Sequence, residues 1–257
     1  MWKKKRNRIE LYYYKYPNIG DILNELLITR LFNITIKHCQ FPEADMVSIG
    51  SIMDKFLENS KIGDNDKNLQ KIANQKKKID VWGTGLMYSY DGEEQKLIRK
   101  CNIWALRGEL TRQALSKIRG RKITCVLADP GLLASLLINP QEKKYKVGII
   151  PHYVDADEEL FQKMKEHYEN AVLIDVKADP ISVLEMISQC EVILSTSLHG
   201  LIIADSFGIP NLWCECSNRI LGDGYKFRDY YSSYGLEVVL NNLNINPYPD
   251  LESVKNQ

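Results

Sequence analysis

One histidine lies in a polar turn between two apolar runs. The turn is Ser195–Gly200; it follows Glu191–Leu194, which predicts a buried strand, and precedes Leu201–Phe207, which predicts a helix. Hydroxyl groups and free N–H groups at the start of a helix attract anions, and a histidine among them can bind an anion or transfer a proton. We therefore expect a reacting centre here, with the ligand contacting Ser195, Thr196, Ser197, Leu198, His199 and Gly200.

Arg107 is the second residue whose type and position indicate chemistry. It lies between a predicted strand, Asn102–Leu106, and a predicted helix, Gly108–Ile118. Its side chain is therefore expected above the carboxyl edge of a sheet, where a planar guanidinium can bind a carboxylate or a phosphate with two hydrogen bonds. A surface ion pair with Glu109 or Glu25 is the alternative.

Glycine and polar residues follow several predicted strands. A tight turn explains each glycine alone, but four such segments at equivalent strand ends suggest backbone that approaches a ligand. For His152, ligand contact and loop packing are both open, and Lys226 suits either sugar contact or helix packing. The residues expected at a substrate site on this reasoning are Gly20, Asp21, Gly50, Ser51, Gly83, Thr84, Gly85, His152 and Lys226.

Alternating strands and helices position these residues. Such alternation predicts parallel sheets covered on both faces, with ligands beyond the carboxyl ends of the strands. Asp21 is expected as the N-cap of a helix over Ile22–Phe32, and Lys61–Lys78 as a loop with part of a helix. The remaining predicted strands are Ile9–Tyr14, Asp45–Gly50, Ile79–Gly85, Ile123–Leu127, Tyr145–Ile150 and Ala171–Val176, and the remaining helices are Asp157–Asn170 and Pro180–Gln189.

The composition is that of an ordinary soluble globular protein. The 257 residues carry a net charge of +1, so no global charge directs the chain to nucleic acid. The polar stretch Asn139–Lys144 predicts a linker between domains 1–141 and 142–257, with Arg107 and His199 lining one cleft between them. No apolar run is long enough for a membrane span, so a cytoplasmic location is expected. The basic start Trp2–Arg8 either contacts the anionic inner face of the membrane or forms a solvated tail.

The order and spacing of these motifs resemble the polysaccharide pyruvyl transferase family. The resemblance adds Asn18 to the site and departs from the family at Ser197, where some members have an arginine. The matching segments are Asn18–Asp21 with Asn24, Ile49–Ser51, Trp82–Gly85, Arg107–Gly108 with Thr111 and Arg112, Asp129–Pro130, Pro151–His152 with Asp155, Ser197–Gly200 with Ala204 and Asp205, Gly208–Pro210, and Lys226–Gly235.

The resemblance implies a fold and a reaction. The fold is two Rossmann-like α/β domains with parallel sheets, arranged as in glycosyltransferase B enzymes with an interdomain cleft. Domain 1–141 would be the acceptor side and contribute Arg107, and domain 142–257 would hold the phosphate of phosphoenolpyruvate near His199. The implied reaction forms a cyclic pyruvyl ketal on a surface polysaccharide precursor, an exopolysaccharide or capsule glycan, and releases phosphate.

Several expectations about partners follow from that reaction. His199 and Arg107 would be catalytic, and neither a cofactor nor a metal is expected. The acceptor would be a lipid-linked oligosaccharide. Two alternatives stay open: a nucleotide-sugar-dependent glycosyltransferase of similar architecture, and a catalytically inactive family member that binds glycan.

Overall fold

The computed structural model describes residues 8–62, 72 and 77–256, which fall into two compact units. The first unit comprises the described residues of Met1–Lys15, Asn24–Pro130 and Gly222–Glu237, and the second those of Tyr16–Leu23, Gly131–Leu221 and Val238–Gln257. Most of the predicted loop and helix over Lys61–Lys78 lies outside the described residues. The domain boundary placed between residues 141 and 142 stays a prediction.

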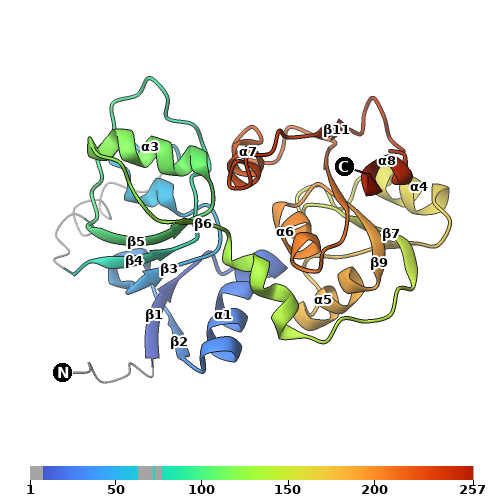
Figure 1. Cartoon of the computed structure of the whole chain (residues 1–257), viewed down its shortest axis with the longest axis horizontal. Helices are drawn as coiled ribbons and strands as arrows, with labels where there is room; N and C mark the ends of the chain where they lie inside the picture. The colour runs from blue at the N-terminus through green and yellow to red at the C-terminus, as the bar shows by residue number, and fades with distance from the viewer. Residues whose placement is uncertain (1–7, 63–71, 73–76, 257) are drawn as a thin grey trace. The chain divides into compact units, whose positions relative to one another are not determined.

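The first unit is built on a parallel sheet of six described strands (Figure 1). Their spatial order is β2-β1-β3-β4-β5-β6. The strands are β1 (Arg8–Tyr12), β2 (Thr35–His38), β3 (Met46–Val47), β4 (Ile79–Trp82), β5 (Cys101–Leu106) and β6 (Val126–Leu127). The helices are α1 (Ile19–Phe32), whose first turn belongs to the second unit, α3 (Glu109–Arg119) and α7 (Tyr225–Ser232), with short 3₁₀ helices over Phe41–Glu43 and Met53–Phe56.

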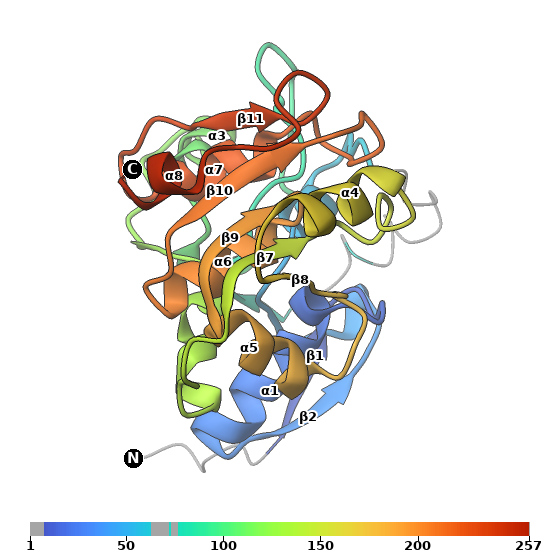
Figure 2. The same ribbon diagram turned by 90° about the vertical axis from the view of Figure 1, so that its right-hand side faces the viewer.

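The second unit has a parallel sheet of five described strands, which Figure 2 shows most openly. Their spatial order is β11-β10-β9-β7-β8. The strands are β7 (Tyr145–Ile150), β8 (Ala171–Leu173), β9 (Cys190–Ser195), β10 (Asn211–Glu215) and β11 (Leu240–Asn242). The helices are α4 (Glu159–His167), α5 (Pro180–Ser188), α6 (Leu198–Ser206) and α8 (Leu251–Lys255), and a 3₁₀ segment covers Pro130–Leu137. The α/β class with parallel sheets is thus confirmed.

Both sheets contain a point where the strand order reverses. In the first, the chain passes from β1 to β2 on one side and then to β3 on the other. In the second, it passes from β7 to β8 on one side and to β9 on the other. Ligands of open α/β sheets bind beyond the carboxyl ends of the strands at such points. In the second unit, His152 follows β7 and the turn with His199 follows β9.

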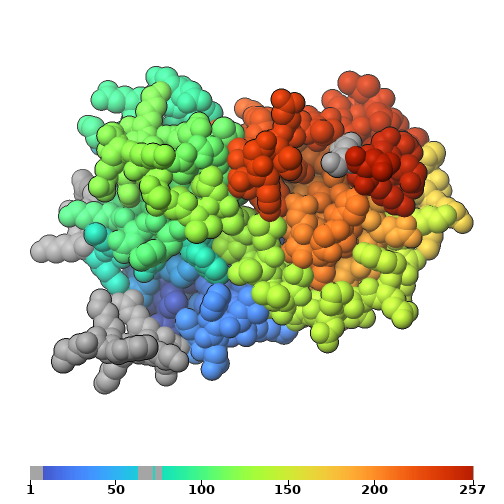
Figure 3. Space-filling model, viewed as in Figure 1, coloured from blue at the N-terminus to red at the C-terminus, as the bar shows by residue number. Residues whose placement is uncertain are grey.

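Apolar patterning explains the elements that carry these residues. The central strand β9 buries its run Val192–Leu194, and α6 buries Leu201–Ala204, as expected of elements packed in the interior of an α/β unit. In contrast, α3 buries Thr111 and Leu115 and ends at Gly120, which has a positive φ of 64°. Figure 1 draws α3 as a green ribbon, and in the same view the space-filling Figure 3 shows green atoms at the surface of the first unit.

Three sequence expectations require correction or addition. The first long helix begins at Ile19 rather than after Asp21, and the side chain of Asn18 accepts a hydrogen bond from the N–H of Asp21 at 3.1 Å. The prediction that Asp21 is the N-cap is therefore wrong, because Asn18 performs that role. Helix α6 begins at Leu198, so His199 lies in its first turn. Strands β2, β10 and β11 were not predicted. None of the described helices combines the length and apolar character that a membrane crossing requires.

Candidate functional site

The turn between β9 and α6 is built by its own hydroxyl groups. Ser195 Oγ accepts a hydrogen bond from the N–H of Ser197 at 3.0 Å and faces the carbonyl oxygens of Ile150 and Ser197 at 3.0 and 2.9 Å. Thr196 Oγ1 accepts a hydrogen bond from the N–H of His152 at 2.7 Å. These two hydroxyls therefore join the ends of β7 and β9. Ser197, the N-cap of α6, makes no side-chain capping bond, and ligand contact by its hydroxyl stays a prediction.

Gly200 allows α6 to pack closely on the end of β9. A Cβ atom at this position would stand 2.4 Å from Ser195 Oγ, well inside van der Waals contact. The neighbouring Leu198 is buried, whereas His199 is half-buried at the start of the same helix. The structure thus assigns Gly200 and Leu198 a packing role in the second unit and leaves ligand contact by either of them a prediction.

His199 lies where two helix N-termini meet. A Cβ atom at Gly20, in the first turn of α1, would stand 2.1 Å from His199 Nδ1, so the imidazole packs directly on the backbone of that turn. The N–H of Ile19 donates to the carbonyl oxygen of Val176 at 2.8 Å, which holds the start of α1 on the second unit. The partial positive charges of both helix starts therefore act near one imidazole.

Asn18 and Asp21 form a polar pair at the start of α1. Asn18 Nδ2 donates to Asp21 Oδ2 at 2.6 Å, in addition to the backbone cap already described. The two side chains are therefore hydrogen-bonded to each other, and they flank Gly20, whose backbone contacts His199. The sequence-predicted residues Asn18, Gly20, Asp21, His152 and His199 are thus gathered near one strand-order reversal.

Two tyrosines beside this group were not predicted as site residues. The rings of Tyr16 and Tyr153 lie 4.6 Å apart between centroids, and His152 lies 4.3 Å from Tyr153. Lys177 Nζ lies 5.8 Å from the Tyr153 ring. Burial, and then the charge of Asp21, raises the pKa of the Tyr153 phenol, which therefore stays protonated at neutral pH. The sequence signal that could have identified these tyrosines is their position next to predicted site residues. Tyr16 precedes Pro17-Asn18, and Tyr153 follows His152.

Arg107 is buried in a hydrogen-bond network of the first unit. Its Nε donates to Asp229 Oδ2 at 2.9 Å, its Nη1 to Ser51 Oγ at 2.8 Å, and its Nη2 to the carbonyl oxygen of Leu86 at 2.5 Å. Asp229 also accepts from the N–H and the hydroxyl of Thr111, both at 2.7 Å. The partner of Arg107 is therefore Asp229 on α7, and neither Glu109 nor Glu25. Donor binding by Arg107 stays a prediction.

The glycine-rich strand ends of the first unit pack around this network. A Cβ atom at Gly85 would stand 2.5 Å from Arg107 Nη2, and one at Gly83 would stand 2.2 Å from Pro130 Cδ. Thr84 Oγ1 donates to the carbonyl oxygen of Gly50 at 2.6 Å and accepts from the N–H of Ile52 at 2.9 Å. The structure thus gives Gly83, Gly85 and Thr84 packing contacts within the first unit, and ligand contact by these residues stays a prediction. Of the three strand-end glycines Gly50, Gly83 and Gly85, Gly50 has a positive φ of 115° together with space for an added Cβ atom.

The predicted site residues thus form two groups, one in each unit. Lys226, on α7 of the first unit, lies 5.5 Å from the ring of Phe227. The predicted cleft shared by Arg107 and His199 stays a prediction. Within the described residues, no three His, Cys, Asp or Glu side chains are grouped to hold a metal ion.

Comparison with known proteins identifies the family. The family model for polysaccharide pyruvyl transferase matches residues 2–218. The chain is 30% identical over 196 residues to an uncharacterized protein of Acanthamoeba polyphaga mimivirus, covering 71% of this chain and 67% of that one. It is 25% identical over 235 residues to the succinoglycan biosynthesis protein ExoV of Rhizobium meliloti (strain 1021), covering 88% of this chain and 65% of that one. The chain therefore spans about two thirds of each relative, and it belongs to the polysaccharide pyruvyl transferase family of enzymes.

Proposed function

We propose that this enzyme transfers the pyruvyl unit of phosphoenolpyruvate to two hydroxyls of a sugar in a polysaccharide precursor. The product is a cyclic ketal, and inorganic phosphate is released. Family membership and the similarity to a succinoglycan biosynthesis protein support pyruvyl transfer to a polysaccharide. The donor, the ketal and the roles of single residues are our inference from the site in the second unit.

The observation that carries the proposal is the position of His199 between two helix N-termini. Phosphoenolpyruvate bears a phosphate and a carboxylate, and the start of a helix binds either anion through its N–H groups and dipole. The start of α6 offers the Ser197 hydroxyl as well, and the start of α1 packs on the imidazole through Gly20. The start of α6, with the Ser197 hydroxyl, therefore supplies attraction for an anionic group although position 197 holds no arginine. The N–H groups of Ile19 and Asp21 at the start of α1 are already bound within the protein.

His199 is the proposed general acid. One sugar hydroxyl attacks C2 of the donor while the imidazolium gives a proton to C3, and the imidazole recovers a proton from the attacking hydroxyl. The C2–O bond to phosphate then breaks, and the second hydroxyl closes the ring on C2. Of the two hydroxyl protons, one ends on C3 and the other on phosphate, so the reaction balances without a redox step. No cofactor is required for this chemistry.

The tyrosines beside His152 are the proposed acceptor contact. Tyr16 is 43% exposed and stacks on Tyr153 at a tilt of 35°. Aromatic faces pack against the C–H faces of a sugar ring, and a protonated phenol at the rim donates to sugar oxygens. Because Asn18 and Asp21 add further polar groups nearby, this surface fits a glycan better than an apolar ligand. We propose a lipid-linked oligosaccharide as acceptor, met at the inner face of the membrane.

The test is turnover with a defined donor and acceptor panel. The chain is incubated with phosphoenolpyruvate and lipid-linked or synthetic glycosides, and phosphate release is measured together with the product mass. The expected result is phosphate release that depends on acceptor, with a mass gain equal to pyruvate minus water. Turnover of a sugar nucleotide instead would support a glycosyltransferase, and glycan binding without turnover of any donor would support an inactive member; either result would refute the proposal.

A further inference from the structure

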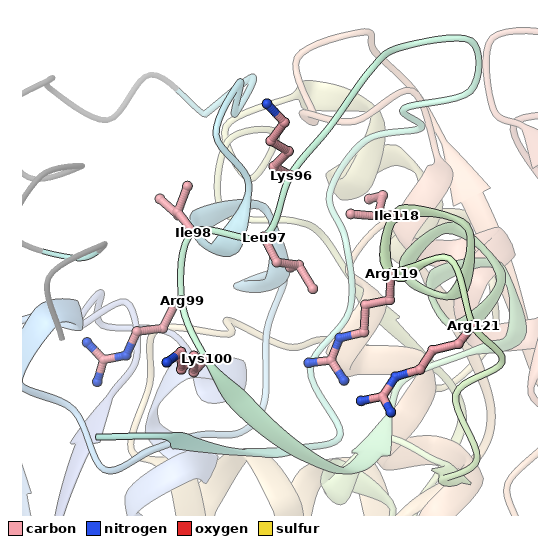
Figure 4. Close-up of a pocket in the computed structure, with 8 residues that line it drawn as sticks. All are labelled: Lys96, Leu97, Ile98, Arg99, Lys100, Ile118, Arg119 and Arg121. Atoms are coloured by element: carbon pink, nitrogen blue, oxygen red, sulfur yellow. The ribbon is translucent and has the colours of Figure 1, made fainter. Parts of the chain in front are cut away.

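A basic pocket lies in the first unit, between the segment that precedes β5 and the end of α3. Its volume is about 480 Å³, within the range of small-ligand sites. It is lined by Lys96, Leu97, Ile98, Arg99, Lys100, Ile118, Arg119 and Arg121 (Figure 4). We call this set the basic pocket. Of these eight described residues, five are cationic and none is acidic, although the whole chain has a net charge of only +1.

The pocket lies at the opposite end of the first sheet from Arg107. Lys100 directly precedes β5, whereas Arg107 directly follows it, so the strand of six residues separates the two. At about 3.3 Å per residue, this separation is roughly 20 Å. Arg119 is the last residue of α3, and Arg121 follows the glycine that ends the helix. The basic pocket is therefore distinct from the network around Arg107.

The described residues supply no carboxylate partner to four of the cations in this pocket. Among the described residues, no carboxylate pairs with Lys96, Lys100, Arg119 or Arg121, whereas Arg112 on the same helix pairs with Glu109 at 2.5 Å. The polar side-chain contacts of Arg119 are to Cys101, at 2.8 Å from its Sγ and 3.5 Å from its carbonyl oxygen. Arg99 differs from these four cations because its guanidinium is buried and donates to the carbonyl oxygens of Pro42 and Ala44.

The helix dipole accounts for only part of this charge. Cations in the last turn of α3 complement the negative end of the helix, which explains Lys117 and Arg119. Lys96 and Lys100 belong to the segment before β5 and contribute to no helix terminus. Figure 4 shows the side chains of Arg119 and Arg121 pointing to the same side, toward the segment that carries Lys100. Cations from two separate segments therefore surround one hollow.

The geometry points to a phosphate-bearing anion as the ligand of the basic pocket. Two guanidinium forks offer paired N–H donors that match phosphate oxygens, and two lysines add charge that one monoanion would not balance. A second hollow of about 450 Å³ shares Arg121 and adds Lys117 and Lys122, which widens the positive surface. The phosphate belongs either to a soluble compound or to an anionic lipid headgroup. This inference does not depend on the proposed function.

The experiment measures binding by the whole chain. Pyrophosphate is titrated by calorimetry, and vesicles of phosphatidylglycerol with phosphatidylcholine are compared with vesicles of phosphatidylcholine alone in co-sedimentation. The pocket variant is Arg119→Gln with Arg121→Gln, and the control is Arg30→Gln with Lys163→Gln, which removes the same charge at exposed sites. A third variant, Lys96→Gln with Lys100→Gln, changes exposed side chains only and guards against misfolding caused by loss of the Cys101 contact.

We expect pyrophosphate affinity to fall about tenfold or more in both pocket variants and to stay unchanged in the control. Equal losses in all three variants, or no binding by the unaltered chain in either assay, would overturn the proposal. Pyrophosphate binding without vesicle binding assigns the pocket to a soluble phosphate compound. Binding to anionic vesicles that the pocket variants lose, and the control keeps, assigns it to a lipid headgroup.

Discussion

The imidazole of His199 packs on the backbone of Gly20, so closely that a Cβ atom there would stand 2.1 Å from Nδ1. Gly20→Ala therefore forces the ring to move away from the start of α1. We expect turnover to fall by about tenfold to a hundredfold, because a displaced general acid no longer reaches its proton acceptor. The assay is phosphate release from phosphoenolpyruvate with a working acceptor.

A second glycine substitution provides the control. Gly92 has a positive φ of 77° and nothing within 4 Å of an added Cβ, so Gly92→Ala strains the backbone without displacing a neighbour. This variant is expected to lose about 1 kcal/mol of stability and to keep its turnover. If Gly20→Ala kept full turnover as well, the contact with His199 would have no catalytic role.

Removal of the imidazole tests the proton transfer directly. His199→Gln keeps a polar side chain at the start of α6 but provides no titrating group. We expect kcat to fall by about a hundredfold or more, the usual scale for loss of a general acid, with little change in the thermal unfolding midpoint. The matched control is His167→Gln, since His167 stacks on Tyr248 in the same unit. Near-normal kcat in His199→Gln would exclude the residue from the chemistry.

The tyrosine pair gives a prediction about the acceptor alone. Tyr16→Ala removes one face of the stack with Tyr153, and the lost sugar contact should raise the acceptor KM about tenfold. The donor KM and kcat should change by less than about twofold, because ground-state and transition-state contacts with the sugar ring weaken equally. Tyr234→Ala, at a tyrosine of similar exposure in the first unit, is the control. A change confined to the donor KM would contradict the assignment.

Local signals in the sequence were sufficient for part of this structure. Strand β7 (Tyr145–Ile150) was predicted with its observed bounds because its apolar run is bordered by lysines and Pro151. Strand β2 (Thr35–His38) was missed because its alternating residues are only partly buried, as befits the edge of a sheet. The N-cap was misplaced because two residues with capping side chains, Asn18 and Asp21, lie three positions apart.

The features of the candidate site that could not be predicted from the sequence depend on contacts between segments far apart in the chain. The strand–turn–helix around His199 is local, so its residue types and order sufficed. The partner of Arg107 is 122 residues away and was not predicted, because an ion pair between β5 and α7 depends on tertiary packing rather than spacing. The contact of Gly20 with His199 likewise forms only when α1 docks on α6.

A buried carboxyl in the first unit predicts how stability depends on pH. Asp54 accepts hydrogen bonds from the N–H of Met87 and the hydroxyl of Tyr90, both at 2.7 Å, yet burial raises the pKa of this carboxyl above its ordinary value of 3.8. The folded state therefore holds the proton to higher pH than the unfolded state. Its contribution to stability is present below pH 3.8 and is lost as the pH rises through the raised pKa.

Asp54→Asn isolates this contribution because the amide does not ionise. Denaturant unfolding of both proteins is compared from about pH 4 to about pH 8. The free energy of unfolding of the unaltered protein, relative to the variant, should decrease with rising pH and then level off. A relative stability that increases over this range would show that the hydrogen bonds from Met87 and Tyr90 outweigh desolvation.

The buried pair of Arg107 and Asp229 should be among the costliest contacts to break. Arg107→Gln leaves the Asp229 carboxylate buried without its cation. Asp229→Asn leaves the Arg107 guanidinium buried without its anion. Each is expected to lower the free energy of unfolding by about 3–5 kcal/mol. The double variant should lose less than the sum of the two by about 1–3 kcal/mol, because each single change already removes the shared interaction. The control is Arg112→Gln, which breaks the half-buried pair with Glu109 and should cost only about 1 kcal/mol. A cost for Arg107→Gln no larger than that of the control would show that Arg107 does not hold α7 on the first sheet, and would leave its guanidinium available for a ligand.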